Sequence, residues 1–175
     1  MTFEGAWPSA EVVETARLRL EPLRVEHAEE MAPLLDDQSL HEFIGGHPAT
    51  REELQRRYAQ QIRGCSADGT EGWLNWIARC RENGAAVGTV QATLRRTGGH
   101  MSAEVAWVIA GPYQRQGYAP EAAKGMVEWL RQHGTDVVVA LIHPDHTASI
   151  GVALQLGLRP TDIVVDGEVR WVSRP

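Results

Sequence analysis

The sequence has few of the features that mark a secreted, metal-binding or membrane protein. It contains two cysteines, Cys65 and Cys80, whose spacing matches neither a zinc site nor a redox pair. So little cysteine is typical of a reducing compartment. No apolar run approaches the roughly 20 residues that span a bilayer, and the start of the chain lacks the basic and apolar segments of a signal peptide. We therefore expect a cytoplasmic protein with no membrane partner.

A surplus of positive charge is also missing. The chain has 17 Lys and Arg against 23 Asp and Glu, a formal net charge of −6. This balance argues against non-specific nucleic-acid binding, which depends on basic residues, and it is compatible with a cationic substrate. With 175 residues, 43% of them apolar, we expect one globular domain over residues 1–175 that buries its own core.

Two common phosphate-binding motifs are absent, and a different one is present. Neither G-x-G-x-x-G nor G-x-x-x-x-G-K-[ST] occurs. Instead, within residues 108–124, an apolar strand runs through a turn, Gln114 to Ala119, directly into Pro120. Proline is favoured at the first position of a helix, so the helix is predicted to begin at about Pro120. The turn then lies at the helix N-terminus, where free N–H groups and the dipole attract anions, and Gly117 leaves room for a phosphate.

Hydrophobic periodicity and turn signals predict the remaining elements. Residues 1–13 are expected to be an irregular lead-in, and residues 43–48 and 65–72 are expected to be loops. Thr50 with Glu53 forms a capping-box pattern, and Asn83-Gly84 is a hairpin turn signal. Strands are predicted over residues 17–20, 73–81, 86–94, 102–109, 136–142, 158–165 and 168–172. Helices are predicted over residues 25–35, 50–63 and 147–156, and from residue 120 to a stop at Gly134. The order is β-α-α-β-β-β-α-β-α-β-β.

The pattern Gln-x-x-Gly-x-Ala between a strand and a helix resembles the pyrophosphate-binding loop of the GNAT superfamily of acyl-CoA-dependent N-acyltransferases. The element order resembles the GNAT fold along nearly the whole chain. This implies an α/β (α+β) fold with a mixed central sheet of about seven strands, flanked by helices and splayed where acyl-CoA enters. Three runs look like the branch related to RimJ/RimL ribosomal-protein acetyltransferases, which also contains acetyltransferases of small amines and antibiotics: Thr15-x-x-Leu18-x-Leu20, Trp73-x-x-Trp76 and Val87-Gly88-x-Val90.

The resemblance implies that this loop holds acetyl-CoA. The N–H groups of residues 115–119 would cradle the pyrophosphate, and Arg115 and Lys124 would supply charge, although Lys124 is equally compatible with solvated surface. The pantetheine arm would pair with the strand near Val108 and Ile109, where an N–H would polarise the thioester carbonyl as in an oxyanion hole. The cofactor-binding residues implied for this part of the chain are Val108, Ile109, Gln114, Arg115, Gln116, Gly117, Tyr118, Ala119 and Lys124.

A second part of the chain resembles the family with departures. His146-x-x-Ser149 resembles the family's Asn-x-x-Ser, so His146 stands where an asparagine usually bonds the pantetheine arm. A neutral imidazole has one donor and one acceptor, but plain helix-terminal surface is also compatible. Ala153 replaces the tyrosine that often protonates the departing thiolate. Ser149 is the nearest substitute as an acid, unless it only bonds its own backbone. A thiol of pKa about 8.5 already leaves readily.

Glu104 is the candidate general base. It lies on the strand that leads to the loop and alternates with Ala106 and Val108, so we expect it to face the groove that they face. RimJ/RimL-like chains resemble this sequence in carrying a glutamate there. A carboxylate that takes the proton through one water suffices as the base for an α-amine of pKa about 8. A solvated strand carboxylate is equally compatible.

Aromatic residues mark the expected acceptor side. Trp73, Trp76 and Trp107 have the character of core residues, although one of them could line the acceptor pocket. Phe43 and His47 lie on the loop between the first two helices, which borders the acceptor side in this family. His41 and His47 have no complete ligand set beside them, so no metal site is predicted.

The sequence therefore predicts an N-acetyltransferase that moves an acetyl group from acetyl-CoA to a primary amine by direct attack in a ternary complex. The acceptor is a protein N-terminus or a small amine, and the sequence does not separate them. The competing hypothesis is a non-catalytic acyl-CoA-binding sensor, which Ala153 and His146 favour and Glu104 disfavours. A homodimer is left open.

Overall fold

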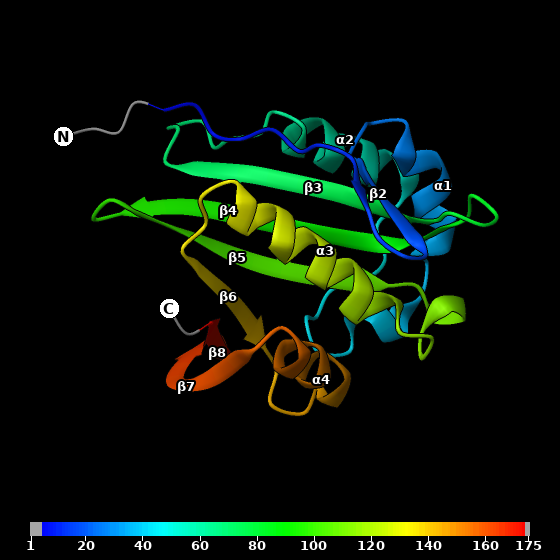
Figure 1. Ribbon diagram of the computed structural model, residues 1–175. Helices are drawn as coiled ribbons and strands as arrows, with labels where there is room; N and C mark the ends of the chain where they lie inside the picture. The colour runs from blue at the N-terminus through cyan, green and yellow to red at the C-terminus, as the bar shows by residue number, and fades with distance from the viewer. Residues whose placement is uncertain (1–4, 174–175) are drawn as a thin grey trace.

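A single eight-stranded sheet forms the centre of the molecule (Figure 1). The computed structural model describes residues 5–173, so the first four residues of the expected lead-in lie outside the described residues. The strand order across the sheet is β1-β2-β3-β4-β5-β6-β8-β7. The strands are β1 (Val13–Glu14), β2 (Leu18–Pro22), β3 (Glu71–Cys80), β4 (Ala86–Thr97), β5 (His100–Ile109), β6 (Val137–Ile142), β7 (Leu158–Val165) and β8 (Glu168–Ser173). The helices are α1 (His27–Leu34), α2 (Arg51–Gln61), α3 (Tyr118–Gln132) and α4 (Thr147–Gln155).

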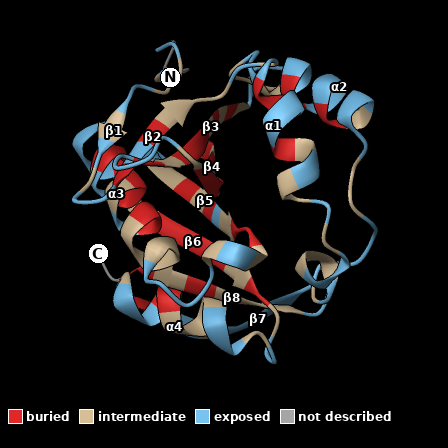
Figure 2. Ribbon diagram, turned by 90° about the vertical axis from the view of Figure 1, so that its right-hand side faces the viewer, coloured by how far each residue is buried: buried red, intermediate tan, exposed pale blue. Residues whose placement is uncertain are grey.

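Helices cover both faces of the sheet, and each face has its own core (Figure 2). The larger core lies under α3, where Met126 and Leu130 pack against alternate residues of β2 to β6. The smaller core lies under α1 and α2, where Met31 and Leu54 pack against Ile77. This division follows from the period of two along each strand, which sends successive side chains to opposite faces.

Strands β3, β4 and β5 form an antiparallel meander whose register places three residues side by side at each level. On the face under α1 and α2 these rows are Glu71–Arg95–Ser102, Trp73–Thr93–Glu104, Asn75–Gln91–Ala106 and Ile77–Thr89–Val108. We call this surface the groove face. It carries the polar side chains of the sheet, because the opposite face is filled by α3.

Strands β5 and β6 separate along their length. They pair in parallel over only three positions, Ser102–Glu104 with Val137–Val139. Beyond Glu104 the last five residues of β5 have no partner on β6 among the described residues. The expected splay of the sheet is therefore confirmed, and Glu104 stands at the point where the two strands part.

Most predicted elements are confirmed, including the capping box at Thr50 and Glu53. Two predictions need correction. The sheet has eight strands, because Val13 and Glu14 pair with β2 at the end of the expected lead-in. Helix α3 begins at Tyr118 rather than at about Pro120. Proline is tolerated anywhere in the first turn, because the first four N–H groups of a helix have no partner within it. Within residues 5–173, no helix has the length and apolar character to cross a bilayer.

Candidate active site

Residues 114–119 comprise the turn that leads into α3 and the first two residues of that helix, and we call this segment the mouth of α3. Gly117 caps the helix with φ of 78°, and Arg115 has φ of 62°, so both occupy the left-handed region. This path turns the backbone so that, among the described residues, the N–H groups of residues 115–119 have no acceptor. Gln114 ties the turn to the sheet by donating from Nε2 to the Ile109 carbonyl at 2.9 Å. Free N–H groups at a helix N-terminus suit a pyrophosphate.

Arg17 adds a positive charge at the mouth of α3 that sequence analysis missed. Its Nη1 donates to the Gln116 carbonyl at 2.8 Å, and its Nη2 pairs with Glu121 at 2.7 Å. The guanidinium also lies over the Tyr118 ring, 4.4 Å from the centroid. Arg17 lies about 100 residues before the turn, and only the packing of β2 beside α3 brings them together. No local signal in the sequence could have identified it.

The end of β5 is held in place from the β4 side. Gly88 lies opposite Ile109, and a Cβ at Gly88 would stand 2.1 Å from the Val108 carbonyl oxygen. A larger residue would therefore push the splayed end of β5 away from β4. This contact gives a structural reason for the glycine in the run Val87-Gly88-x-Val90, and it positions Val108 and Ile109 beside the mouth of α3.

His146 and Ser149 form a small hydrogen-bonded unit at the start of α4. His146 caps the helix, with Nδ1 accepting the Ser149 N–H at 3.4 Å. Its Nε2 lies 3.1 Å from Ser149 Oγ. Burial lowers the pKa of His146 below its ordinary value, so the ring is neutral at neutral pH. Because Nδ1 accepts, Nε2 carries the proton and donates to Oγ, which leaves the Ser149 hydroxyl proton free for another acceptor.

Phe43 packs against the histidines at the start of α4 and does not line the capped pocket. Its ring stacks on His146 with centroids 4.5 Å apart and lies 5.2 Å from the ring of His143. The loop between α1 and α2 thus reaches across to the start of α4. The structure brings together Phe43, expected on the acceptor side, and His146, expected on the cofactor side.

Glu104 lies on the groove face, beside Ala106 and Val108 in the alternation of β5. Its side chain is 38% exposed and pairs with Arg95 at 3.2 Å, and Arg95 also pairs with Glu71 at 2.8 Å. A second carboxylate lies nearby on β8. Burial and the charge of Glu104 raise the pKa of Glu168 above its ordinary value. Sequence analysis missed Glu168, because its hairpin reaches the site only through the pairing of β8 with β6.

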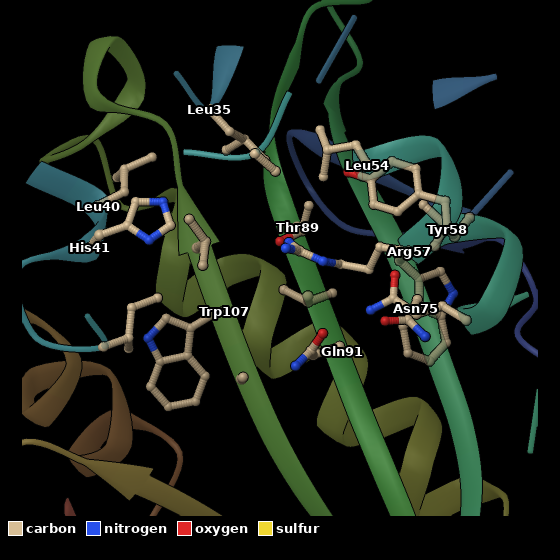
Figure 3. A pocket seen from close by; sticks show the side chains of 18 residues that line it. Leu35, Leu40, His41, Leu54, Arg57, Tyr58, Asn75, Thr89, Gln91 and Trp107 are labelled. Carbon is tan, nitrogen blue, oxygen red and sulfur yellow. The ribbon is translucent and has the colours of Figure 1, made fainter. Parts of the chain in front are cut away.

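A cavity of about 340 Å³ opens on the groove face between β3–β5 and the α1–α2 cap (Figure 3). We call it the capped pocket. Its cap is apolar, with Leu35, Leu40 and Leu54 among its residues, and its floor includes Ala106 and Val108. Of the three tryptophans considered for the acceptor side, Trp76 and Trp107 are both among its lining residues. Its polar groups, which sequence analysis did not identify, are Asn75, Thr89, Gln91, Arg57, Tyr58, His41 and Gln61.

Three expected site residues lie elsewhere. Lys124 is two turns into α3 and lines a separate hollow with β1, beside Glu121 and Glu128. His47 is exposed, and its Nδ1 lies 3.1 Å from the Pro48 carbonyl rather than in the capped pocket. Trp73 is on the groove face but pairs with Glu71 through Nε1 at 3.3 Å, outside the cavity. Within residues 5–173, no three His, Cys, Asp or Glu side chains gather to hold a metal.

Comparisons with known proteins agree with this geometry. The family model for the acetyltransferase (GNAT) domain matches residues 17–159. The comparison with curated proteins gave no match. Among solved structures, a GNAT-family acetyltransferase from Bacillus anthracis is 17% identical, with a TM-score of 0.72 over 93% of this chain and 97% of that one. Ribosomal-protein-S5-alanine acetyltransferase from Vibrio fischeri is 14% identical, with a TM-score of 0.72 over 94% of this chain and 96% of that one.

A third neighbour is RimL, a ribosomal L7/L12 alpha-N-protein acetyltransferase solved in complex with coenzyme A. It is 14% identical and has a TM-score of 0.73 over 93% of this chain and 97% of that one. These identities show a shared fold, and the family model covers most of the chain. The chain therefore belongs to the GNAT acetyltransferase family, resembles its RimJ/RimL-like branch, and is an acyl-CoA-dependent acetyltransferase with acetyl-CoA as its co-substrate.

Proposed function

We propose that the chain, acting as one catalytic domain over residues 1–175, transfers the acetyl group of acetyl-CoA to a small primary amine by direct attack in a ternary complex. The observation that carries this proposal is the meeting of two sites at the end of β5. Val108 lines the capped pocket, and the Gln114 side chain ties the mouth of α3 to the carbonyl of the adjacent Ile109. A cofactor at one site and an amine at the other would meet there.

Cofactor binding would rest mainly on backbone groups. The N–H groups of residues 115–119 would bind the pyrophosphate, with Arg17 and Arg115 contributing charge. The splayed end of β5 offers Val108 and Ile109 as backbone partners for the pantetheine arm. Acetyl-CoA supplies the activated thioester when bound, and an N–H at this edge would stabilise the negative charge that develops on its carbonyl oxygen.

Proton removal from the amine falls to Glu104. The amine nitrogen forms a bond to the acetyl carbon, the C–S bond breaks, and the nitrogen loses one proton. Glu104 shares the groove face with Ala106 and Val108 and lies one row beyond the capped pocket. Because Glu104 lies four residues before Val108, roughly 13 Å along the strand, it would take the proton through a chain of waters. Glu168, whose pKa is raised by burial and by the nearby charge of Glu104, would attract the ammonium form of the acceptor to this end of the groove.

The departing sulfur would be met by the His146–Ser149 unit. The neutral His146 donates to Ser149 Oγ, which directs the hydroxyl proton away from the imidazole. A thiolate beside α4 could accept that hydrogen bond. The demand on Ser149 is modest, because a thiol of pKa about 8.5 needs little protonation to leave.

The test is the release of free thiol from acetyl-CoA with a panel of small amines and short peptides with free N-termini. We expect turnover with small amines that fit the capped pocket. Higher kcat/KM with peptides would identify a protein N-terminus as the acceptor. Tight binding of acetyl-CoA without turnover on any member of the panel would favour the alternative of a sensor module.

A further inference from the structure

We infer that the amine acceptor carries a carboxylate, and that Arg57 binds this carboxylate in the capped pocket. The inference rests on the proposed function, because it concerns the acceptor of that reaction. It assigns the pocket two ends of opposite charge, with Arg57 at one and Glu104 and Glu168 near the other. The acceptor would be a zwitterion with an apolar body between its amine and its carboxylate.

The capped pocket has a positive rather than a negative lining. The chain has an excess of acidic residues, yet none of the residues that line the pocket is Asp or Glu. Arg57 is the one arginine among them. In the described part of the chain its guanidinium has no ion pair, and Glu53, one turn before it, accepts the Thr50 N–H instead. An arginine beside apolar walls and without a carboxylate suits an oxyanion from outside the chain.

The polar side chains near Arg57 could also bind an oxyanion. Figure 3 shows Arg57 extending from α2 toward Thr89, with the amides of Asn75 and Gln91 on the same floor. Among residues 5–173, the side chains of Thr89, Asn75 and Gln91 have no hydrogen-bond partner of their own. Tyr58 also lines the pocket, and burial raises its pKa to about 12, so its hydroxyl keeps its proton. The charged end of the pocket is therefore rich in donors.

The register of the sheet sets the size of the acceptor. Thr89 lies directly opposite Val108, so one strand spacing of about 4.8 Å separates the floor beneath Arg57 from the edge of β5. Allowing for side-chain reach, a carboxylate on Arg57 and an amine beside β5 would be roughly 5–10 Å apart. The walls between them are apolar, with Leu35, Leu40 and Leu54 among the lining residues. A benzene ring or short alkyl chain fits this description.

The experiment compares four amines on one skeleton: para-(aminomethyl)benzoate and its carboxamide, methyl and phosphonate counterparts. For the unaltered enzyme we expect kcat/KM for the carboxylate to exceed that for the carboxamide by about 10- to 100-fold, because the neutral compound leaves Arg57 unpaired. Arg57→Met keeps the apolar stem and should bring the ratio close to one. The matched control is Arg56→Gln, because Arg56 is exposed on α2 like Arg57 but does not line the pocket, so this variant should keep the ratio.

A ratio near one in the unaltered enzyme, or an unchanged ratio in Arg57→Met, would overturn the inference. Preference for the phosphonate would assign a tetrahedral oxyanion rather than a carboxylate, and preference for N-terminal peptides would assign a macromolecular acceptor. Failure of the proposed function has a different signature, because no amine would then release thiol. Titration calorimetry with para-(aminomethyl)benzoate would still decide the inference, since equal affinity for the unaltered protein and Arg57→Met would contradict it.

Discussion

The mouth of α3 and the capped pocket border the same end of β5 but are built from different groups. At the mouth of α3 the donors are backbone N–H groups of five consecutive residues, exposed by the left-handed Arg115 and Gly117. In the capped pocket the polar groups are side chains from α2, β3 and β4, such as Arg57, Asn75 and Gln91. Binding at the mouth of α3 would depend on the course of the backbone, and binding in the capped pocket would depend on which side chains line it.

This difference predicts how each site responds to mutation. Backbone donors persist through most substitutions and are lost when the loop path or its free space changes. A side-chain pocket keeps its shape through small changes of backbone and alters its ligand preference when one polar group is replaced. Substitutions at the mouth of α3 should therefore change cofactor affinity, and substitutions on the groove face should change turnover or acceptor preference.

The largest expected effect is at Glu104. Glu104→Gln removes the proton acceptor and should lower kcat by about 10²–10⁴-fold at neutral pH, since that is the usual contribution of a general base. Acetyl-CoA affinity, measured by calorimetry, should not change. Glu71→Gln is the matched control, because Glu71 shares Arg95 with Glu104 and lies outside the capped pocket. Full kcat in Glu104→Gln would remove Glu104 from the reaction.

The next effect is at Gly117. Gly117→Glu should weaken acetyl-CoA binding by more than about tenfold, or about 1.4 kcal/mol, because it places an anion among the backbone N–H groups that would bind the pyrophosphate. A Cβ at this position would also lie 3.2 Å from Arg17 Nη2 and would occupy φ of 78°. Gly117→Ala carries the same backbone strain without the charge, so the difference between the two variants isolates the electrostatic part. Unchanged affinity in both variants would contradict the role of the loop.

A smaller effect is expected at Ser149. Ser149→Ala should lower kcat by about tenfold or less, because a thiolate of pKa about 8.5 leaves without a strong acid. The pH–rate profile should lack a fall above about pH 10 from an essential phenol, since Ala153 stands where a tyrosine is expected. If kcat collapses in Ser149→Ala, or if the rate falls steeply above about pH 10 in enzyme that is still folded, the reaction uses a dedicated general acid. Tyr118 and His146 would then be tested by substitution.

The smallest expected effect concerns stability and pH. Burial lowers the pKa of His146 in the folded state, whereas the unfolded chain titrates near the ordinary value of 6.5. Below that pH the unfolded state binds more protons, so the unfolding free energy should fall as the pH falls. His146→Asn keeps a good helix cap and should reduce this loss between pH 7.5 and 5.5 by about 1 kcal/mol or less. Urea unfolding measures it.

His47→Asn is the control for that measurement, because His47 is exposed. His27 is buried, and its lowered pKa should leave a residual dependence in His146→Asn. A pH dependence as steep in His146→Asn as in the unaltered protein would contradict the assignment of a neutral, half-buried imidazole at position 146.

Sequence analysis succeeded where the physical signal is local. The strand, turn and helix around Gln114 and Gly117 follow from neighbouring residues, and so does the capping box at Thr50. The helix start was misplaced by two residues, because Pro120 is compatible with several positions in the first turn. The alternation of β5 was enough to predict that Glu104, Ala106 and Val108 share one face.

Local signals did not identify the partners that come from distant elements. Sequence analysis placed Arg17 in a predicted strand and Arg57 in a predicted helix and assigned a role to neither. Phe43, His47 and Trp73 were expected near the acceptor, yet the structure places all three outside the capped pocket. Their types were informative, but their positions depend on how α2 and the α1–α2 loop pack on the sheet.

The amino-acid sequence by itself determined the order of elements, the family and the backbone site at the mouth of α3. Periodicity, capping and turn formation act over a few residues, so they can be recognised in one segment at a time. Only the tertiary structure decided that one cavity is lined by Arg57, Asn75, Thr89 and Gln91 and that Arg17 contacts the mouth of α3. Strand register and helix packing set these distances, and both depend on contacts between residues far apart in the chain.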